Sequence, residues 1–507
     1  MLTRSFMTPE TSKDLLAYTP MFHSRMFTDT PKYRESHFQP IKSGLPPSPS
    51  AHLQTQHTAS DWYLDGNPAI DRPLFVQFCS NSPDDLLEAA RYVQSFCDAV
   101  DLNLGCPQGI AKRGNYGAFL QEDWDLIYKL INRLHKDLEI PVTAKMRVLD
   151  TREKTLDYAK MILSAGASII TVHGRRREQK GHNTGLADWS MIRYLRENLP
   201  SDTVILANGN ILQHNDIREC LEATGADGVM SAEGNLYDPS VFATPPPEGQ
   251  EGREYWRGRD GKGGYRMDAV MRRYMDIIHK YVLGVPPPDR KPLFLPSDPA
   301  ASSNGAETAD STASNDDDQE EPPRKRQKRD KQQKVTSPNL SSMQAHLFHL
   351  LRPLVAKHTN VRDALAKCRT GDIPAFEKVL QMVEDAVEQG LIDYEKDPSS
   401  VEATATPAST VPEPDATDAT KDASSLATVA KCKRPWWVCQ PYVRPLPKEA
   451  LEKGAMMLSK KEKARLEKEE ALTKEAGLQP GGRVEKQQLG DDVERKVEIP
   501  KEGLVCG

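Results

Sequence analysis

The chain of 507 residues is too long for one hydrophobic core, so two or three domains are expected. Its net charge of −6 excludes a protein that is basic throughout, and charge has to be considered segment by segment. Eight cysteines without paired spacing, and no secretory signal pattern, point to a reducing intracellular setting, cytoplasmic or nuclear. No apolar run is long enough to span a bilayer, so no membrane association is expected.

Residues 14–243 alternate short apolar runs with amphipathic stretches, which predicts repeated strand–helix units. Such units favour a parallel sheet, and their number favours an α/β fold of the TIM (β/α)8 barrel type over an open sheet. Only seven strands are found, because residues 1–13 contain no apolar run, so the first barrel strand is expected to be missing. The expected strands are 17–22, 74–80, 99–104, 142–148, 169–174, 204–209 and 228–233, and the expected helices 84–96, 123–138, 155–165, 190–199 and 215–224.

The rest of the chain changes composition several times. Two low-complexity segments cannot bury enough apolar surface to become ordered, and helical periodicity returns between them, in stretches 345–356, 361–368 and 373–389. The expected divisions are a barrel domain with an incomplete N-terminal unit (1–295), a disordered linker with a basic run (296–339), a small all-α domain (340–395), a second disordered linker (396–430), a Trp/Pro-rich motif (431–447) and a charged tail (448–507).

The stretch Asp101-Leu-Asn-Leu-Gly-Cys106-Pro-Gln is the most informative in the chain. Gly105 and Pro107 end an apolar strand, so Cys106 lies at a strand's carboxyl end, where α/β barrels place their active sites. A basic glycine-rich loop containing Lys112 and Arg113 follows. A thiol in such a pocket can serve as a nucleophile or proton donor, whereas a lone cysteine beside a strand is as often a small buried hydrophobic residue.

Polar residues follow the later strands at the same point. Lys145, inside an apolar strand, either faces a bound anion or reaches water past the barrel rim. His173 is either a ligand or a satisfied core residue, and the arginines from Arg175 onward either bind phosphate or form a solvated loop. Asn208-Gly209-Asn210 and 228–234 end the last two strands, where barrels commonly bind phosphate. The shared placement of these residues predicts one site at one mouth of the barrel.

With these motifs in view, the chain resembles the tRNA-dihydrouridine synthases, most of all the eukaryotic Dus1-like group. The resembling segments cover about residues 15–243, and Trp436-Trp-Val-Cys-Gln-Pro-Tyr-Val-Arg-Pro445 resembles the C-terminal region of that group. The motifs are Tyr18-Thr-Pro-Met-Phe-His-Ser, Val76-Gln-Phe-Cys, Asp101-Leu-Asn-Leu-Gly-Cys-Pro-Gln, Lys112-Arg-Gly-Asn-Tyr-Gly-Ala-Phe-Leu, Lys145-Met-Arg, Val172-His-Gly-Arg, Ala207-Asn-Gly-Asn-Ile and Gly228-Val-Met-Ser-Ala-Glu-Gly.

The resemblance implies a monomeric FMN-binding barrel and a tRNA-binding helical domain, with no metal. The implied activity is reduction of specific uridines of the tRNA D-loop, at positions 16 and 17, to 5,6-dihydrouridine with NADPH. Carried over by motif, Cys106 would be the catalytic acid. The residues implied to bind FMN are Gln77, Lys145, His173, Asn208, Gly209, Asn210, Ala232 and Glu233, and those implied to contact substrate are Asn103, Lys112, Arg113 and Arg175.

The chain departs from the family pattern in two places. The Ala-Pro-Met segment of the first strand is not found, and Ala232-Glu233 stand where many members have Gly-Arg. A glutamate cannot donate a hydrogen bond to phosphate as an arginine does, although backbone N–H groups can. A catalytically impaired tRNA-binding protein of the same fold therefore stays open as an alternative, and so does an FMN barrel reductase acting on a small enone.

The helical domain and the first linker carry basic residues with two interpretations each. Those in the helical domain either contact tRNA phosphates or form an ordinary charged helix surface. The basic run 324–329 is a nuclear localisation signal, a tRNA-binding patch or solvated linker. The helical-domain residues are Arg352, Lys357, His358, Arg362, Lys367 and Arg369.

Overall fold

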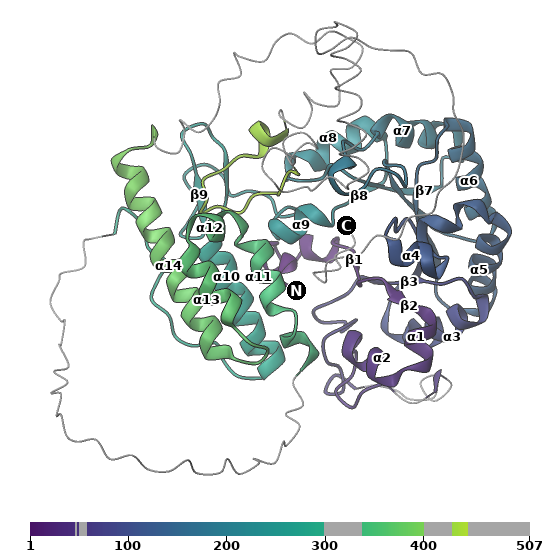
Figure 1. Ribbon diagram of the computed structural model, residues 1–507, viewed down its shortest axis with the longest axis horizontal. Coiled ribbons are helices and arrows are strands. Elements are labelled where there is room, and N and C mark those ends of the chain that lie inside the picture. The colour runs from purple at the N-terminus through teal and green to yellow at the C-terminus, as the bar shows by residue number, and fades with distance from the viewer. Residues whose placement is uncertain (46–47, 50–57, 299–336, 400–427, 445–507) are drawn as a thin grey trace, which may run out of the picture. The chain divides into compact units, whose positions relative to one another are not determined.

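The computed structural model describes residues 1–45, 48–49, 58–298, 337–399 and 428–444 (Figure 1). Contacts divide these residues into a sheet unit, 1–244 with 428–433 and 440–444, and a helical unit, 245–298 and 337–399 with 434–439. The predicted barrel boundary at residue 295 therefore moves to residue 244. The basic run 324–329, most of both expected linkers and the whole charged tail lie outside the described residues.

The sheet unit is built on a parallel sheet in which each strand pairs with its successor in the chain. β1 and β2 both pair with β3 and share one position, because Pro20 lies between them and has no N–H for the ladder. The described part of the chain thus fills seven positions of the TIM-type barrel, as the seven apolar runs predict. The strands are β1 Ala17–Tyr18, β2 Phe22–His23, β3 Leu74–Cys79, β4 Ala99–Leu104, β5 Val142–Arg147, β6 Ile169–His173, β7 Val204–Asn208 and β8 Gly228–Met230.

Helices connect the strands and cover one face of the sheet. Four of them begin where the sequence supplies a side-chain cap: Ser82, Asp123, Thr151 and Asp188 each accept a hydrogen bond from a backbone N–H in the first turn. Figure 1 shows α3, α5, α6, α7 and α8 following one another around the outer side of the strands. The helices of this unit are α1 Ser24–Asp29, α2 Pro31–His37, α3 Pro83–Val93, α4 Gly109–Gly114, α5 Trp124–Asp137, α6 Arg152–Ser164, α7 Trp189–Asn198, α8 Asn215–Thr224 and α9 Glu233–Tyr237.

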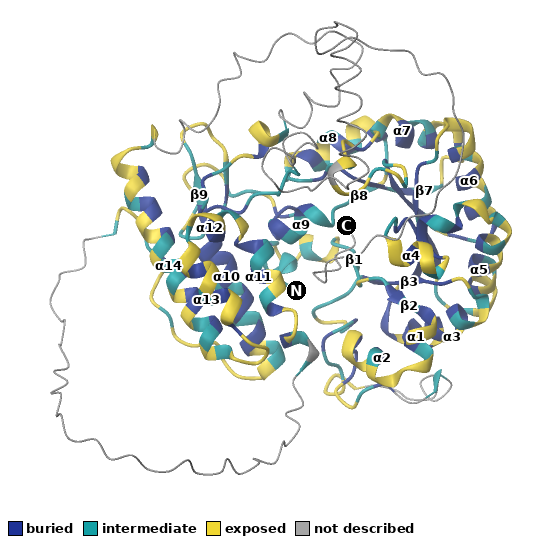
Figure 2. Ribbon diagram, viewed as in Figure 1, coloured by how far each residue is buried: buried dark blue, intermediate teal, exposed yellow. Residues whose placement is uncertain are grey.

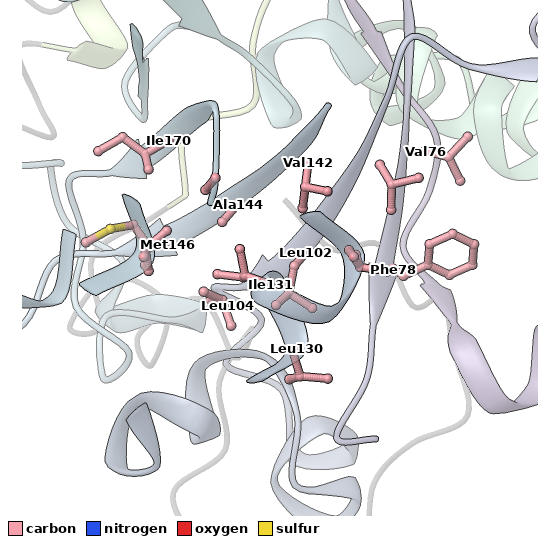
Figure 3. Packing of buried hydrophobic residues seen from close by; sticks show 14 of the residues in the cluster. Val76, Phe78, Leu102, Leu104, Leu130, Ile131, Val142, Ala144, Met146 and Ile170 are labelled. Atoms are coloured by element: carbon pink, nitrogen blue, oxygen red, sulfur yellow. The ribbon is translucent and has the colours of Figure 1, made fainter. Parts of the chain in front are cut away.

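The core of this unit lies between the sheet and these helices. Figure 3 shows Val76, Leu102 and Ala144 of three neighbouring strands in the same packed layer as Leu130 and Ile131 of α5. Figure 2 shows the complementary pattern on the helices, with buried residues toward the strands and exposed residues outside. Because side chains alternate along a strand, the residues between these apolar positions point to the opposite face, which carries the candidate site.

The helical unit combines a short antiparallel hairpin with a group of helices. Residues from 245 onward belong to this unit because α10 packs against α14, and Arg272 of α10 donates to Glu384 of α14 at 2.6 Å. The expected helix 345–356 is divided, because Pro353 lies in the first turn of a new helix. The elements are β9 Tyr255–Arg257, β10 Gly263–Tyr265, α10 Met267–Ile277, continued by a π-helical turn Ile278–Leu283, α11 Met343–Leu350, α12 Arg352–Lys357, α13 Thr359–Lys367 and α14 Ile373–Lys396.

The Trp/Pro-rich motif contributes to both units. In the helical unit, Trp437 is buried and its ring lies 6.0 Å from Trp256 and 6.1 Å from Tyr394. In the sheet unit, the ring of Tyr442 lies 5.8 Å from that of Tyr237 on α9. Neither unit contains, among its described residues, a helix with the length and hydropathy needed to cross a membrane.

Candidate functional site

Three registered rows of polar side chains cross the face of the sheet that the helices do not cover. Strand pairing sets each row, and successive rows advance along the strands, so that the third row lies at the carboxyl ends of β5, β6 and β7. The rows are Gln77, Asp101 and Thr143; then Asn103, Lys145 and Thr171; and finally Arg147, His173 and Asn208. The structure thus brings the predicted Gln77, Asn103, Lys145, His173 and Asn208 onto one face.

A buried carboxylate organises the first row. Asp101 accepts hydrogen bonds from Gln77 Nε2 at 2.9 Å and from the Thr143 hydroxyl at 2.6 Å. Burial raises the pKa of Asp101 to about 6, and its two hydrogen bonds and Lys145 oppose that rise. The same Gln77 accepts from Asn103 Nδ2 at 2.8 Å, so one network fixes three strands. Sequence reasoning assigned no role to Asp101, although Asp101-Leu-Asn103 already shows polar residues alternating with an apolar one.

Asn103 and Arg147 hold the turn that carries Cys106. Asn103 Oδ1 accepts the backbone N–H groups of Gly105 and Cys106 at 3.0 and 2.9 Å, a side-chain turn that fixes the end of β4. The buried Arg147 donates from Nε to the Gly105 carbonyl at 2.6 Å. Cys106 itself is buried, with Cys79, Ala111 and Tyr116 around it. The thiol is therefore held at the carboxyl end of a strand, as the sequence predicts.

Gly117 packs directly against Cys106, in a position that leaves no room for a side chain. Replacing Gly117 with alanine should lower the free energy of unfolding by about 1–2 kcal/mol or more. Gly117 has φ +63°, a left-handed conformation, and an added Cβ would lie 2.9 Å from the Cβ and carbonyl oxygen of Cys106. Gly109→Ala is the matched control, since a Cβ there meets nothing within 4 Å. Chemical denaturation of both variants measures the difference, and equal stabilities would contradict the close packing described.

The loop after β6 is tied to the end of the neighbouring strand. Arg175 donates from Nη1 to His173 Nε2 at 3.0 Å and from Nη2 to Asn210 Oδ1 at 2.9 Å. Asn210 also binds both polar groups of the Ala187 backbone. A Cβ on Gly209, at φ +111°, would lie 2.6 Å from Ala187 Cβ. The predicted Arg175, Gly209 and Asn210 thus lie together beside His173 and shape the site through contacts within the protein.

His173 is a neutral imidazole in this arrangement. Burial lowers its pKa well below the usual value, and Lys145, Arg147 and Arg175 lower it further. An arginine only donates, so His173 Nε2 accepts and the proton lies on Nδ1. Both His173 Nδ1 and Asn208 Oδ1 are buried, and neither has a hydrogen-bond partner among the described residues. One donor and one acceptor on adjacent strands are therefore available to a bound polar molecule.

The remaining predicted residues lie in the loops at the same edge. Ala232 and Glu233 follow β8 at the start of α9, and Glu233 accepts a hydrogen bond from Arg444 Nη2 at 2.9 Å. Lys112 and Arg113 lie exposed in the last turn of α4. Sequence reasoning singled out neither Arg147 nor Arg444, because the partners of both are distant in the chain.

The arginines after His173 are not a solvated loop throughout. Arg177 donates to the Ala118 carbonyl at 3.3 Å and to Glu122 at 2.6 Å, and Lys180 donates to the Pro107 carbonyl at 3.0 Å. These contacts join the loop after β6 to the loop that carries Cys106. The site residues therefore rest on a connected set of loops at one end of the sheet.

Comparison with known proteins gives consistent matches over most of the chain. The model of the dihydrouridine synthase (Dus) family matches residues 2–279. A protein named tRNA-dihydrouridine(16/17) synthase in Schizosaccharomyces pombe is 38% identical over 436 residues, covering 85% of this chain and 82% of that protein. Its namesake in Saccharomyces cerevisiae is 39% identical over 436 residues, covering 85% and 78%. A protein of Rattus norvegicus named as like these synthases is 32% identical over 456 residues, covering 90% and 74%.

Proposed function

Because this chain belongs to the dihydrouridine synthase family, we propose that it reduces uridines of the tRNA D-loop, at positions 16 and 17, to 5,6-dihydrouridine with FMN and NADPH. The observation that carries the proposal is a buried thiol, Cys106, held at a strand's carboxyl end beside three rows of polar side chains. The names of the relatives from two yeasts supply the two tRNA positions.

The polar face of the sheet has the donors and acceptors that a flavin needs. A flavin ring presents carbonyl oxygens and N–H groups, and the partnerless His173 Nδ1 and Asn208 Oδ1 match one of each. Gln77 and the half-buried Lys145 lie on the same face. These four side chains, with the backbone at Gly209-Asn210 and Ala232-Glu233, are the groups we assign to FMN.

The reaction adds a hydride and a proton across the C5=C6 bond of uracil. FMN reduced by NADPH supplies the hydride at C6 when it is bound. Negative charge then develops on the conjugated C4 carbonyl of the base, and a proton is needed at C5. An ordinary cysteine thiol, with a pKa of about 8.5, is mostly protonated at neutral pH and can deliver that proton. Cys106 takes this role, and Asn103 and Arg147 position it.

Charge and hydrogen bonding from the chain support the same step. The ammonium of Lys145 lies in the row next to the Cys106 turn, where a positive charge stabilises developing anions. Asn103 uses one amide hydrogen on Gln77, which leaves the second for a uracil carbonyl once the base has left its stack. The exposed Lys112 and Arg113 are suited to phosphate groups of the tRNA backbone.

The proposal is tested with the purified full-length chain, FMN, NADPH and unmodified tRNA. Mass spectrometry should detect a gain of two hydrogens in D-loop uridines. A tRNA with cytidines at positions 16 and 17 should gain none, and modification elsewhere would contradict the assigned positions. A chain that binds tRNA but holds no flavin and forms no dihydrouridine would establish the impaired tRNA-binding alternative instead.

A further inference from the structure

The loop after β8 has a charge that does not suit its position. Loops after the last two strands of an α/β barrel commonly bind the phosphate of a ligand. This loop carries Glu233 at the start of α9, and a carboxylate repels a phosphate. A phosphate bound here therefore requires a cation from elsewhere in the chain.

The structure supplies that cation from the C-terminal motif, 211 residues away in sequence. Arg444 Nη2 donates to Glu233 Oε1 at 2.9 Å, and Nη1 donates to the Thr184 hydroxyl at 2.9 Å. The guanidinium thus lies between the loops after β6 and β8. Its side chain is 38% exposed, and a guanidinium has five N–H donors, so donors remain for a further anion.

A second guanidinium lies close to this pair. Burial lowers the pKa of Arg175 to about 10, with Arg147 and Arg444 adding to the effect and Glu233 opposing it. Arg175 also donates to His173, whose Nδ1 is buried without a partner. Two arginines against one glutamate leave the region between these loops positively charged, which favours an anion.

We propose that Arg444 binds the phosphate of FMN and supplies the guanidinium that the loop after β8 lacks. The inference rests on the proposed function and adds a residue to its cofactor site. Glu233 then has the role of orienting Arg444, because its carboxylate uses one edge of the guanidinium and leaves the rest for phosphate. The motif beyond residue 439 is accordingly part of the flavin site.

The test compares FMN with riboflavin, which has the same ring and no phosphate. Dissociation constants are measured by flavin fluorescence on the full-length chain. Arg444→Ala should weaken FMN binding about 10- to 100-fold and change riboflavin binding less than about twofold. Arg218→Ala, which removes an exposed arginine paired with Glu222, is the control and should change neither constant. Unchanged riboflavin affinity also shows that the variant is folded.

Two further variants test whether Arg444 binds the FMN phosphate or only holds the C-terminal motif against the loop after β8. Glu233→Gln should bind FMN at least as well as the parent, because it removes a negative charge and keeps Arg444. The double variant Glu233→Arg/Arg444→Ala should recover the preference for FMN over riboflavin. The inference would be overturned if Arg444→Ala lost affinity for FMN and riboflavin to the same extent. It would also be overturned if Glu233→Gln bound FMN as weakly as Arg444→Ala does. Either result would leave the proposed function intact. A parent chain that binds neither flavin would overturn both.

Discussion

Replacing Cys106 with alanine is expected to lower the rate of dihydrouridine formation by about 10²- to 10⁴-fold, the usual contribution of a positioned acid. The variant loses the proton donor but keeps the polar rows that we assign to the flavin, so FMN affinity should stay within about twofold of the parent. Cys106→Ser should be nearly as slow, because a hydroxyl is a much weaker acid than a thiol. Product formed in a single turnover, measured by mass spectrometry, gives the rate of the chemical step.

Cys220→Ala is the matched control for this prediction. Cys220 is also buried, and burial raises its pKa to about 11, but it lies on α8 within the apolar core and away from the polar face. The control should therefore react at about the parental rate. A Cys106→Ala variant as fast as Cys220→Ala would remove Cys106 from the mechanism.

The sequence predicts the central strands closely because their signal is local. The expected strand 99–104 and helix 215–224 coincide with β4 and α8. The strand ends follow from glycine, proline and polar residues after apolar runs, so Cys106, Lys145, His173 and Asn208 could be located without a structure. That these residues share one face of the sheet could be known only from the strand register, which is set by pairing between residues distant in sequence.

Short helices, and features that depend on contacts between distant segments, do not follow from the sequence. The helices α1 and α2 have too few turns for a clear periodicity. The domain boundary at residue 244 depends on α10 packing against α14, more than a hundred residues later. Arg444 lies in a motif that sequence reasoning noted for its tryptophans, and its partners Glu233 and Thr184 lie in loops of the sheet unit. No local pattern contains that information.

Asp101→Ala should lower the free energy of unfolding by about 2–5 kcal/mol, since it leaves two buried donors, Gln77 Nε2 and the Thr143 hydroxyl, without an acceptor. Urea denaturation at pH 7 measures the loss. Asp150→Ala is the control, because Asp150 is an exposed carboxylate paired with Lys154, and its removal should produce no measurable change. Equal stability of the two variants would show that Asp101 does not organise the site.

The pH dependence of stability tests the same carboxyl group with a variant, Asp101→Asn, that keeps the size and shape of the side chain. The pKa of Asp101 is raised to about 6 in the folded chain, whereas an unfolded aspartate titrates near 3.9, so the folded state holds the proton more tightly. Stability should therefore fall as the pH rises from about 4 to 6, and Asp101→Asn should show a smaller fall. The half-buried Asp65, whose pKa is also raised to about 6, contributes equally to parent and variant and cancels in their difference. Parallel stability curves for the two proteins would mean that the pKa of Asp101 is not raised in the folded state, and that the polar face is more hydrated than its burial indicates.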